Sequence, residues 1–415
     1  MSEPQARVVI VGAGHAGGTA AALLRQYGYT GAITLIGEEP IPPYQRPPLS
    51  KGFLKKMEEI AQLHRAEAWY EDAGITVRLG EPAVRIDREG QVVALCNGDE
   101  IAYGQLVLAT GGRARLLADL PTGLANVATL RSAGDAQALR AQLNAFDSFT
   151  VVGGGFIGLE FAATARGLGK RVTVVESAPR LLARAVSPEL SAHVLQVHRD
   201  AGIEIHLQAR IDGFELADSG DDPGGSAGRL AAIVLDGARH PVDLLLLGIG
   251  SLPETGLAEA AGLECDNGIV VDEFMVTSDP AILAVGDCTS FPDIAGGRRL
   301  RLESVQNAND QARTAVATLT GARRPHNAVP WFWSEQGSLR LQMAGLPPAH
   351  AERHRRPGAK ADSFSVFHYA DGVLHCVESV NAPLDHMMAR KLLEAGKSPA
   401  AAKACDPAVA LKSLL

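Results

Sequence analysis

Paired cysteines are missing from this 415-residue sequence. The five cysteines are odd in number, lie far apart, and form neither a CxxC motif nor the spacing of metal ligands: Cys96, Cys265, Cys288, Cys376 and Cys405. This distribution argues against a disulfide scaffold and gives no support to a metal site. It favours a reduced, cytoplasmic protein. Cys288 is interpreted as a buried structural thiol.

An excess of positive charge and long apolar runs are also missing. The net charge of -8 and the isoelectric point near 5.9 provide no general attraction for nucleic acid or anionic membranes. The longest apolar runs, such as Leu244 to Ile249, are too short to span a bilayer and predict buried strands. No basic and apolar leader precedes Arg7, so we expect no secretory signal. These features predict a soluble protein without nucleic-acid or membrane partners.

Glycine, by contrast, is abundant, and it is concentrated in two motifs. The first follows the β-branched run Arg7 to Val11 and reads Gly12-Ala13-Gly14-His15-Ala16-Gly17, before a helical pattern that ends near Gly28. In a strand–turn–helix context, the first glycine permits the turn, the second lets a pyrophosphate approach, and the third lets helix and strand pack. An acidic residue for the adenosine ribose follows a second strand, at Glu38.

The pattern recurs in the middle of the chain. Residues Thr150 to Val152 lead into Gly153-Gly154-Gly155-Phe156-Ile157-Gly158, and a later strand ends at Glu176. Two complete copies predict two dinucleotide sites and therefore two cofactors. A carboxylate at Glu176 favours NADH over NADPH, because it accepts from a free 2′-hydroxyl and repels a 2′-phosphate. Arg180, four residues further on, leaves the strictness of that preference open.

The length predicts two or three domains. The buried strand Ala281 to Val285 indicates that the chain returns to the first domain, with the second nucleotide unit inserted. We expect an FAD-binding domain at residues 1–113 and 243–321, an NAD-binding domain at 114–242, and a C-terminal domain at 322–415. The fold class is α/β, with two Rossmann-like domains and a C-terminal α+β interface domain. A hairpin tip is predicted at residues 218–228, and a C-terminal hairpin from the alternation in Ser363 to Tyr369 and Val373 to Val380.

The sequence resembles the FAD-dependent pyridine nucleotide reductases that have two dinucleotide folds and a C-terminal interface domain. More narrowly, it is similar to the NADH-dependent ferredoxin reductases of bacterial cytochrome P450 and aromatic dioxygenase systems. The motifs VGAGHAG, RPPLSK, LATGG, VVGGGFIGLE, AVGDC, ESVQNA and WFWSEQ carry the resemblance, which covers the whole chain and is looser after Gln336.

The resemblance implies two sets of cofactor-binding residues. Those assigned to FAD are Gly12, Gly14, Ala16, Gly17, Glu38, Arg46, Lys51, Ala83, Arg131, Asp287, Val305 and Trp333. Those assigned to NADH are Gly153, Gly155, Ile157, Gly158, Glu160 and Glu176. The resemblance also implies catalytic roles for Lys51, near the flavin ring, and for Glu160, beside the nicotinamide and paired with Lys51 when nicotinamide is absent.

The segment PPYQRPPLSK, residues 42–51, lies where disulfide-reductase relatives carry a redox-active cysteine pair, and it holds no cysteine. The resemblance therefore implies that electrons leave the reduced flavin directly for a [2Fe-2S] ferredoxin, an acidic protein bound transiently. A local basic face would meet it, with candidates Arg298, Arg299, Arg301, Arg313, Arg323 and Arg324. The protein is expected to be a monomer or a weak dimer. The alternatives are a monodehydroascorbate- or quinone-type reductase and a non-catalytic flavoprotein like apoptosis-inducing factor.

Overall fold

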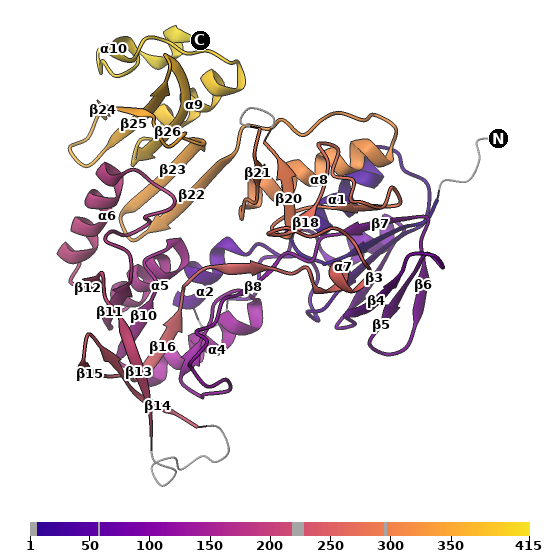
Figure 1. Ribbon diagram of the computed structural model, residues 1–415, viewed down its shortest axis with the longest axis horizontal. Coiled ribbons are helices and arrows are strands. Elements are labelled where there is room, and N and C mark those ends of the chain that lie inside the picture. Colours follow the sequence, from indigo (N-terminus) through magenta and orange to yellow (C-terminus); the bar gives the residue numbers. More distant parts are fainter. Residues whose placement is uncertain (1–5, 57–58, 218–227, 294–296) are drawn as a thin grey trace. The chain divides into compact units, whose positions relative to one another are not determined.

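The computed structural model describes residues 6–56, 59–217, 228–293 and 297–415 (Figure 1). The chain forms two compact units, each assembled from separate stretches of sequence. The first unit contains the residues up to Gln45, Gln62–Arg113 and Leu252–Pro330. The second contains Arg46–Ala61, Ala114–Ser251 and Trp331–Leu415. Within the described ranges, no helix is long and apolar enough to cross a bilayer.

A parallel five-stranded sheet forms the centre of the first unit, in the order β19-β7-β1-β2-β3. Its strands are β1 (Val8–Val11), β2 (Ile33–Gly37), β3 (Ile75–Leu79), β7 (Gln105–Leu108) and β19 (Ile282–Ala284). All of β1 is buried, as expected for a parallel strand covered on both faces. Because β19 pairs with β7, through Ile282 opposite Leu106, the predicted discontinuity of the first dinucleotide fold is confirmed.

The remaining elements of the first unit surround this sheet. Helices α1 (His15–Gln26) and α8 (Val305–Leu319) pack against each other (Figure 1). The others are the helices α3 (Glu67–Asp72) and α7 (Gly256–Ala260), the antiparallel strands β4 (Ala83–Asp87), β5 (Val92–Leu95) and β6 (Glu100–Ala102), and the short strands β18 (Ile269–Val270), β20 (Thr289–Pro292) and β21 (Arg299–Leu300). The Asn97-Gly98 turn joins β5 to β6, and Gly98 has the positive φ of +90° that this turn favours.

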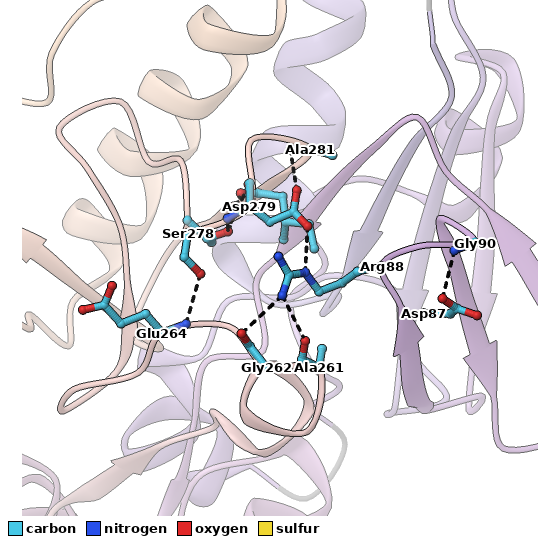
Figure 2. Close-up of polar contacts among 11 residues, drawn as sticks. Asp87, Arg88, Gly90, Ala261, Gly262, Glu264, Ser278, Asp279 and Ala281 are labelled. Atoms are coloured by element: carbon cyan, nitrogen blue, oxygen red, sulfur yellow. Dashed lines mark hydrogen bonds and ion pairs between the residues drawn. The ribbon is translucent and has the colours of Figure 1, made fainter.

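Arg88 connects the β4–β5 turn of the first unit to its later chain segment (Figure 2). Its Nε atom lies 2.7 Å from Oδ2 of Asp279, and its Nη1 atom donates to the carbonyl oxygens of Ala261 and Gly262 at 3.4 and 3.3 Å. The other Asp279 oxygen accepts from the backbone N–H of Ala281 at 3.0 Å. Burial alone would raise the pKa of Asp279, but these hydrogen bonds outweigh it and lower the pKa below its usual value.

Asp279→Asn is expected to destabilise the first unit by about 1–3 kcal/mol at pH 7, because it removes a hydrogen-bonded ion pair that is partly buried. The carboxyl pKa is lower in the folded than in the unfolded chain. Its stabilisation is therefore present above the unfolded pKa of about 3.9 and lost as the pH falls through the folded value. Urea denaturation at pH 7, and again at a pH below the folded pKa of Asp279, measures the free energy of unfolding of the wild type and the variant.

The exposed pair between Arg85 and Glu100 provides the control, since both side chains are more than half exposed. Glu100→Gln should change stability by less than about 1 kcal/mol. Equal effects of Asp279→Asn and Glu100→Gln at pH 7 would contradict the role given to Arg88.

A second parallel sheet, in the order β12-β11-β10-β16-β9, forms the first half of the second unit. Its strands are β9 (Val127–Ala128), β10 (Ser148–Val152), β11 (Arg171–Glu176), β12 (Glu204–Leu207) and β16 (Leu244–Leu247), with helices α4 (Ala133–Ala145), α5 (Phe156–Gly167) and α6 (Pro188–Asp200). Strand β16 is fully buried, as predicted, and pairs with β10. It lies just past the expected boundary at residue 242 and still belongs to this sheet; the exact domain boundaries stay a prediction.

Short elements complete this half of the unit. They are the 3-10 helix η1 (Pro47–Ser50), the helix α2 (Gly52–Lys55), and the antiparallel strands β13 (Ile211–Leu216), β14 (Leu230–Leu235) and β15 (Ala238–Pro241). The predicted hairpin tip lies outside the described residues except for Gly228, whereas its flanking strands β13 and β14 do pair antiparallel. Helix α2 packs on α4, and η1 packs on α5.

The last part of the second unit is a five-stranded antiparallel sheet with helices. Its order is β22-β23-β26-β25-β24, formed by β22 (Trp331–Gln336), β23 (Leu339–Gly345), β24 (Glu352–Pro357), β25 (Phe364–Ala370) and β26 (Val373–Val380). The helices are α9 (Pro383–Glu394), α10 (Ala401–Ala404) and the 3-10 helix η2 (Leu411–Leu414). The predicted hairpin is confirmed as β25 and β26, and the expected α+β class of this region is confirmed.

Candidate functional site

The first glycine motif, in the first unit, contains two glycines that only close packing can explain and one that faces open space. A Cβ atom on Gly12, whose φ is +112°, would lie 2.1 Å from the carbonyl oxygen of Ala109, and one on Gly17 would lie 1.8 Å from that of Gly12. A Cβ on Gly14 would meet no atom within 4 Å. Gly14 is also the N-cap of α1, so the positive end of the helix dipole faces this open space.

The second motif, in the second unit, repeats this geometry. A Cβ on Gly153, with φ +108°, would lie 2.4 Å from the oxygen of Gly248, and one on Gly158 would lie 2.4 Å from that of Gly153. Gly155 is the N-cap of α5, and its Cβ would have the Gly248 oxygen, at 3.7 Å, as nearest neighbour. Each unit therefore presents a helix N-terminus that a pyrophosphate can approach, which fits one dinucleotide in each.

Glu176 ends β11 beside the second glycine motif. Its Oε2 atom accepts from the backbone N–H of Gly154 at 2.6 Å, and its Oε1 atom accepts from that of Ala178 at 2.7 Å. The Arg180 guanidinium, by contrast, donates to the carbonyl oxygens of Val186 and Ala183 at 2.8 and 2.6 Å. The carboxylate thus stands at the edge of the glycine turn, while the nearby cation is held by its own loop.

The ion pair that the resemblance implies is present in the second unit. Nζ of Lys51 lies 2.6 Å from Oε2 of Glu160, whose side chain is only 4% exposed. Ser50 Oγ donates to the same Oε2 atom at 2.5 Å, and Ser334 Oγ donates to Oε1 at 2.7 Å. One turn after Glu160 on α5, Thr164 donates to the backbone oxygen of Ser50 at 2.9 Å. Helix α5 therefore holds both the side chain of Lys51 and the backbone next to it.

The residues assigned to FAD are divided between the two units. Gly12, Gly14, Ala16, Gly17, Glu38, Ala83, Asp287 and Val305 lie in the first, and Arg46, Lys51, Arg131 and Trp333 lie in the second. In the first unit, a Cβ on Gly286 would lie 3.1 Å from the Cβ of Ala16, which places Asp287 near the start of α1. Val305 is the first residue of α8, and Glu38 directly follows β2.

In the second unit, Arg46 and Arg131 are brought together, because Nη1 of Arg46 donates to the backbone oxygen of Arg131 at 2.6 Å. Trp333 lies in β22 and is partly buried, with its ring 5.5 Å from that of Trp331. Ile157, assigned to NADH, is 44% exposed at the start of α5. The cofactor contacts of all these residues remain predictions.

Sequence reasoning missed the two serines that bind Glu160. Ser50 stands beside Lys51, so its neighbourhood was visible, but nothing in the sequence indicates that it points toward α5. Ser334 lies in the motif WFWSEQ, where alternation on a strand separates it from Trp333 and places it with Gln336 on the opposite face. Only its complete burial, at 0% exposed, shows that this polar residue needs an internal partner.

The basic residues proposed for docking are mostly paired within the first unit. Four of the arginines have acidic partners within 3.5 Å: Arg298 with Asp293, Arg301 with Glu303, Arg313 with Asp310, and Arg323 with Asp272. Arg299 donates to the backbone oxygens of Val271 and Ser290. These arginines therefore add less free positive charge than their number in the sequence suggests.

Cys288 is completely buried, and its Sγ atom contacts the oxygen of Val285 at 3.4 Å. Burial raises the pKa of this thiol, which opposes formation of a reactive thiolate. The burial predicted for Cys288 is confirmed, and all five cysteines are free thiols.

Comparison with known proteins agrees with this geometry. Residues 6–312 match the family described as pyridine nucleotide-disulphide oxidoreductase, and residues 331–415 match the reductase C-terminal domain. The chain is 44% identical to rhodocoxin reductase of Rhodococcus erythropolis over 93% of this chain and 89% of that protein.

Two solved structures are also similar. The ferredoxin reductase for the CYP199A2 system of Rhodopseudomonas palustris has a TM-score of 0.92 and 44% identity, over 98% of this chain and 99% of that one. The covalent putidaredoxin reductase–putidaredoxin complex has a TM-score of 0.93 and 37% identity, over 99% and 98%. This chain therefore belongs to the pyridine nucleotide-disulphide oxidoreductase family, and within it to the flavoprotein reductases that resemble putidaredoxin reductase.

Proposed function

We propose that the protein transfers electrons from NADH through FAD to a [2Fe-2S] ferredoxin that supplies a bacterial cytochrome P450 or aromatic dioxygenase. The observation that carries the proposal is the ion pair between the buried Glu160 and Lys51, whose segment, residues 42–51, holds no cysteine. The relatives described above are reductases of the same overall length and architecture, which supports a small electron-carrier protein as the acceptor. A cytoplasmic location is part of the proposal and is supported by the five free thiols.

Each of the two glycine motifs would bind one of the cofactors. The N-terminus of α1, with Gly14 open to solvent, would bind the FAD pyrophosphate, and the N-terminus of α5, with Gly155 open, would bind that of NADH. Glu176 would accept from the adenosine 2′-hydroxyl. Since Arg180 is already bound to carbonyl oxygens of its own loop, it would not be available to a 2′-phosphate without breaking those bonds. NADH is therefore the preferred reductant.

When bound, FAD accepts a hydride from NADH and passes electrons singly to an acceptor. The protein residues hold charge and orientation around this chemistry. Lys51 would keep an ammonium close to the negative charge that hydride transfer places on the ring, and Glu160 holds that ammonium in position. Ser50 and Ser334 donate to Glu160 and keep its carboxylate oriented. No step requires a thiol.

Ferredoxin dependence tests the proposal. NADH-driven reduction of cytochrome c should be slow with the protein alone and should rise strongly when a [2Fe-2S] ferredoxin is added. Ferredoxin reduction should slow as ionic strength rises, because an acidic partner is steered by charge, whereas reduction of small ferricyanide should change little. A quinone that accepts electrons faster than every tested ferredoxin, or an NADH-reduced flavin that no acceptor reoxidises, would contradict the proposal.

A further inference from the structure

A chain of buried polar side chains extends from Glu160 into the C-terminal sheet and on to helix α6, all within the second unit. Ser334 Oγ lies 2.7 Å from Oε1 of Glu160, and Nε2 of Gln336 lies 3.1 Å from Ser334 Oγ. Oε1 of Gln336 lies 2.8 Å from Nε2 of His198. The four side chains come from α5, β22 and α6, which meet at this point.

The chemistry of the four groups permits one direction of hydrogen bonding. A carboxylate only accepts, so Ser334 must give its single proton to Glu160. The Ser334 oxygen is then the acceptor for the Gln336 amide nitrogen, which leaves the amide oxygen facing His198. His198 must therefore carry its proton on Nε2. All the donors point toward Glu160, an arrangement in which each bond polarises the next.

Because these four side chains are buried, losing any one of their hydrogen bonds should lower the stability of the protein. Over the whole residue, backbone included, the exposed fractions are 3% for Glu160, 0% for Ser334, 1% for Gln336 and 2% for His198. Burial lowers the pKa of His198, which its hydrogen bond to Gln336 opposes only in part, so the ring is neutral at pH 7. Each member satisfies its neighbour away from water, and removing one leaves a buried group unpaired.

The chain also explains how both oxygens of Glu160 are held. Oε2 accepts from Lys51 and Ser50, which belong to the segment just before α2. Oε1 accepts from Ser334 alone among the contacts recorded for the described residues. With one oxygen held from each side, the carboxylate plane cannot rotate freely, and the direction in which it presents Oε2 to Lys51 is set by Ser334.

We propose that Ser334, Gln336 and His198 are positioning residues that orient Glu160, and through it Lys51, so that these three side chains contribute to hydride transfer from NADH without touching either cofactor. The catalytic part of this inference rests on the function proposed above. The orientation of Lys51 by the chain is a property of the protein itself and can be measured separately.

Chemical labelling tests whether these residues hold Lys51 in place, because an ammonium held by Glu160 reacts more slowly than a free one. Limited acetylation followed by mass spectrometry gives the reactivity of Lys51 relative to Lys56, whose side chain is 73% exposed and serves as an internal reference. Ser334→Ala should raise the relative reactivity of Lys51 about tenfold and lower the rate constant for flavin reduction by NADH about tenfold, the effect of losing one hydrogen bond to a charged group. The dissociation constant for NADH should stay within about twofold, because no binding contact is lost.

Conservative and matched variants separate positioning from general damage. Ser334→Thr keeps a hydroxyl at this strand position, so the relative reactivity of Lys51 and the rate constant for flavin reduction should stay near their wild-type values. Ser365→Ala is the control, since Ser365 is equally buried in the same sheet but bonds to Ser379 at 2.9 Å instead. At the far end of the hydrogen-bonded series, His198→Phe should raise the reactivity of Lys51 and slow flavin reduction, as Ser334→Ala does. His198→Gln, which keeps an N–H donor, should change both quantities less. Gln336→Leu should match His198→Phe.

The outcomes are distinct. If Ser334→Ala matches Ser365→Ala in both readouts, the positioning role is wrong. If Ser334→Ala alone has an effect while Gln336→Leu and His198→Phe match Ser365→Ala, the chain beyond Ser334 is only structural and the proposal fails for those residues. If Lys51 labelling responds as expected but reduction by NADH does not, the positioning is upheld and the catalytic role of Lys51 is the part that fails.

Discussion

Gly155→Val is expected to give a yellow protein that no longer binds NADH with useful affinity. The backbone at Gly155 has φ −83° and ψ 177°, an extended conformation that valine adopts readily, and a Cβ there has no neighbour closer than 3.7 Å. The variant should therefore fold. Its side chain would fill the space in front of α5 where a pyrophosphate must lie, so two or more charge-assisted hydrogen bonds to the helix N-terminus would be lost. We expect the dissociation constant for NADH to rise by about 100-fold or more.

The corresponding change in the first motif is the matched control. Gly14 has φ −85° and ψ −162°, and its Cβ would face open space, so Gly14→Val should also fold. This variant should lose FAD and be colourless. Absorbance gives the flavin content of each protein, and anaerobic titration gives NADH affinity. The assignment of the two glycine motifs to their cofactors would be wrong if the Gly155→Val protein were reduced at the same NADH concentrations as the wild-type protein. It would also be wrong if Gly155→Val lost its flavin as Gly14→Val does.

Lys51→Met is expected to slow flavin reduction by NADH about 100-fold, the loss typical when one preorganised charge is removed from a reacting centre. The same change leaves Glu160, only 4% exposed, without its cation, which should cost about 3–5 kcal/mol of stability. Anaerobic stopped-flow absorbance measures the rate constant, and thermal unfolding measures the stability.

The double variant Lys51→Met with Glu160→Gln separates these two effects. It should recover most of the stability, because neither charge remains buried alone, while reduction stays slow. If the double variant instead recovered the rate of reduction along with the stability, the effect of Lys51→Met on rate would be a consequence of damage to the fold. If Lys51→Met changed neither the flavin spectrum nor the rate, its catalytic role would be lost.

Much of the architecture was predictable because the glycine motifs carry their own structural context. A strand, three spaced glycines, a helix and an acidic residue twenty or so positions later describe a complete supersecondary unit, so Gly12 to Glu38 and Gly153 to Glu176 could be placed from local sequence. The return of the chain at Ala281 to Val285 was predictable for a similar reason, as a short buried strand that ends in a glycine turn.

Long-range polar contacts were not predictable in this way. Only residues 103 and 104 separate β6 from β7 in the sequence, but β6 joins a hairpin and β7 joins the central parallel sheet, because the partner strand decides the sheet. Ser334 and Gln336 look like exposed strand residues until the packing of α5 against β22 buries them. Among the arginines proposed for docking, Arg323 shows the same difficulty, since its acidic partner Asp272 lies 51 positions earlier in the sequence.

The most direct test of the central claim is an anaerobic stopped-flow experiment with the holoprotein. One equivalent of NADH should bleach the flavin, and mixing with excess [2Fe-2S] ferredoxin should restore its colour while two ferredoxins are reduced for each NADH consumed. That stoichiometry is expected if an electron pair enters from NADH and leaves as single electrons without a thiol relay. A flavin that NADH does not bleach, or a reduced flavin that ferredoxin leaves reduced while a disulfide or a quinone reoxidises it, would contradict the account.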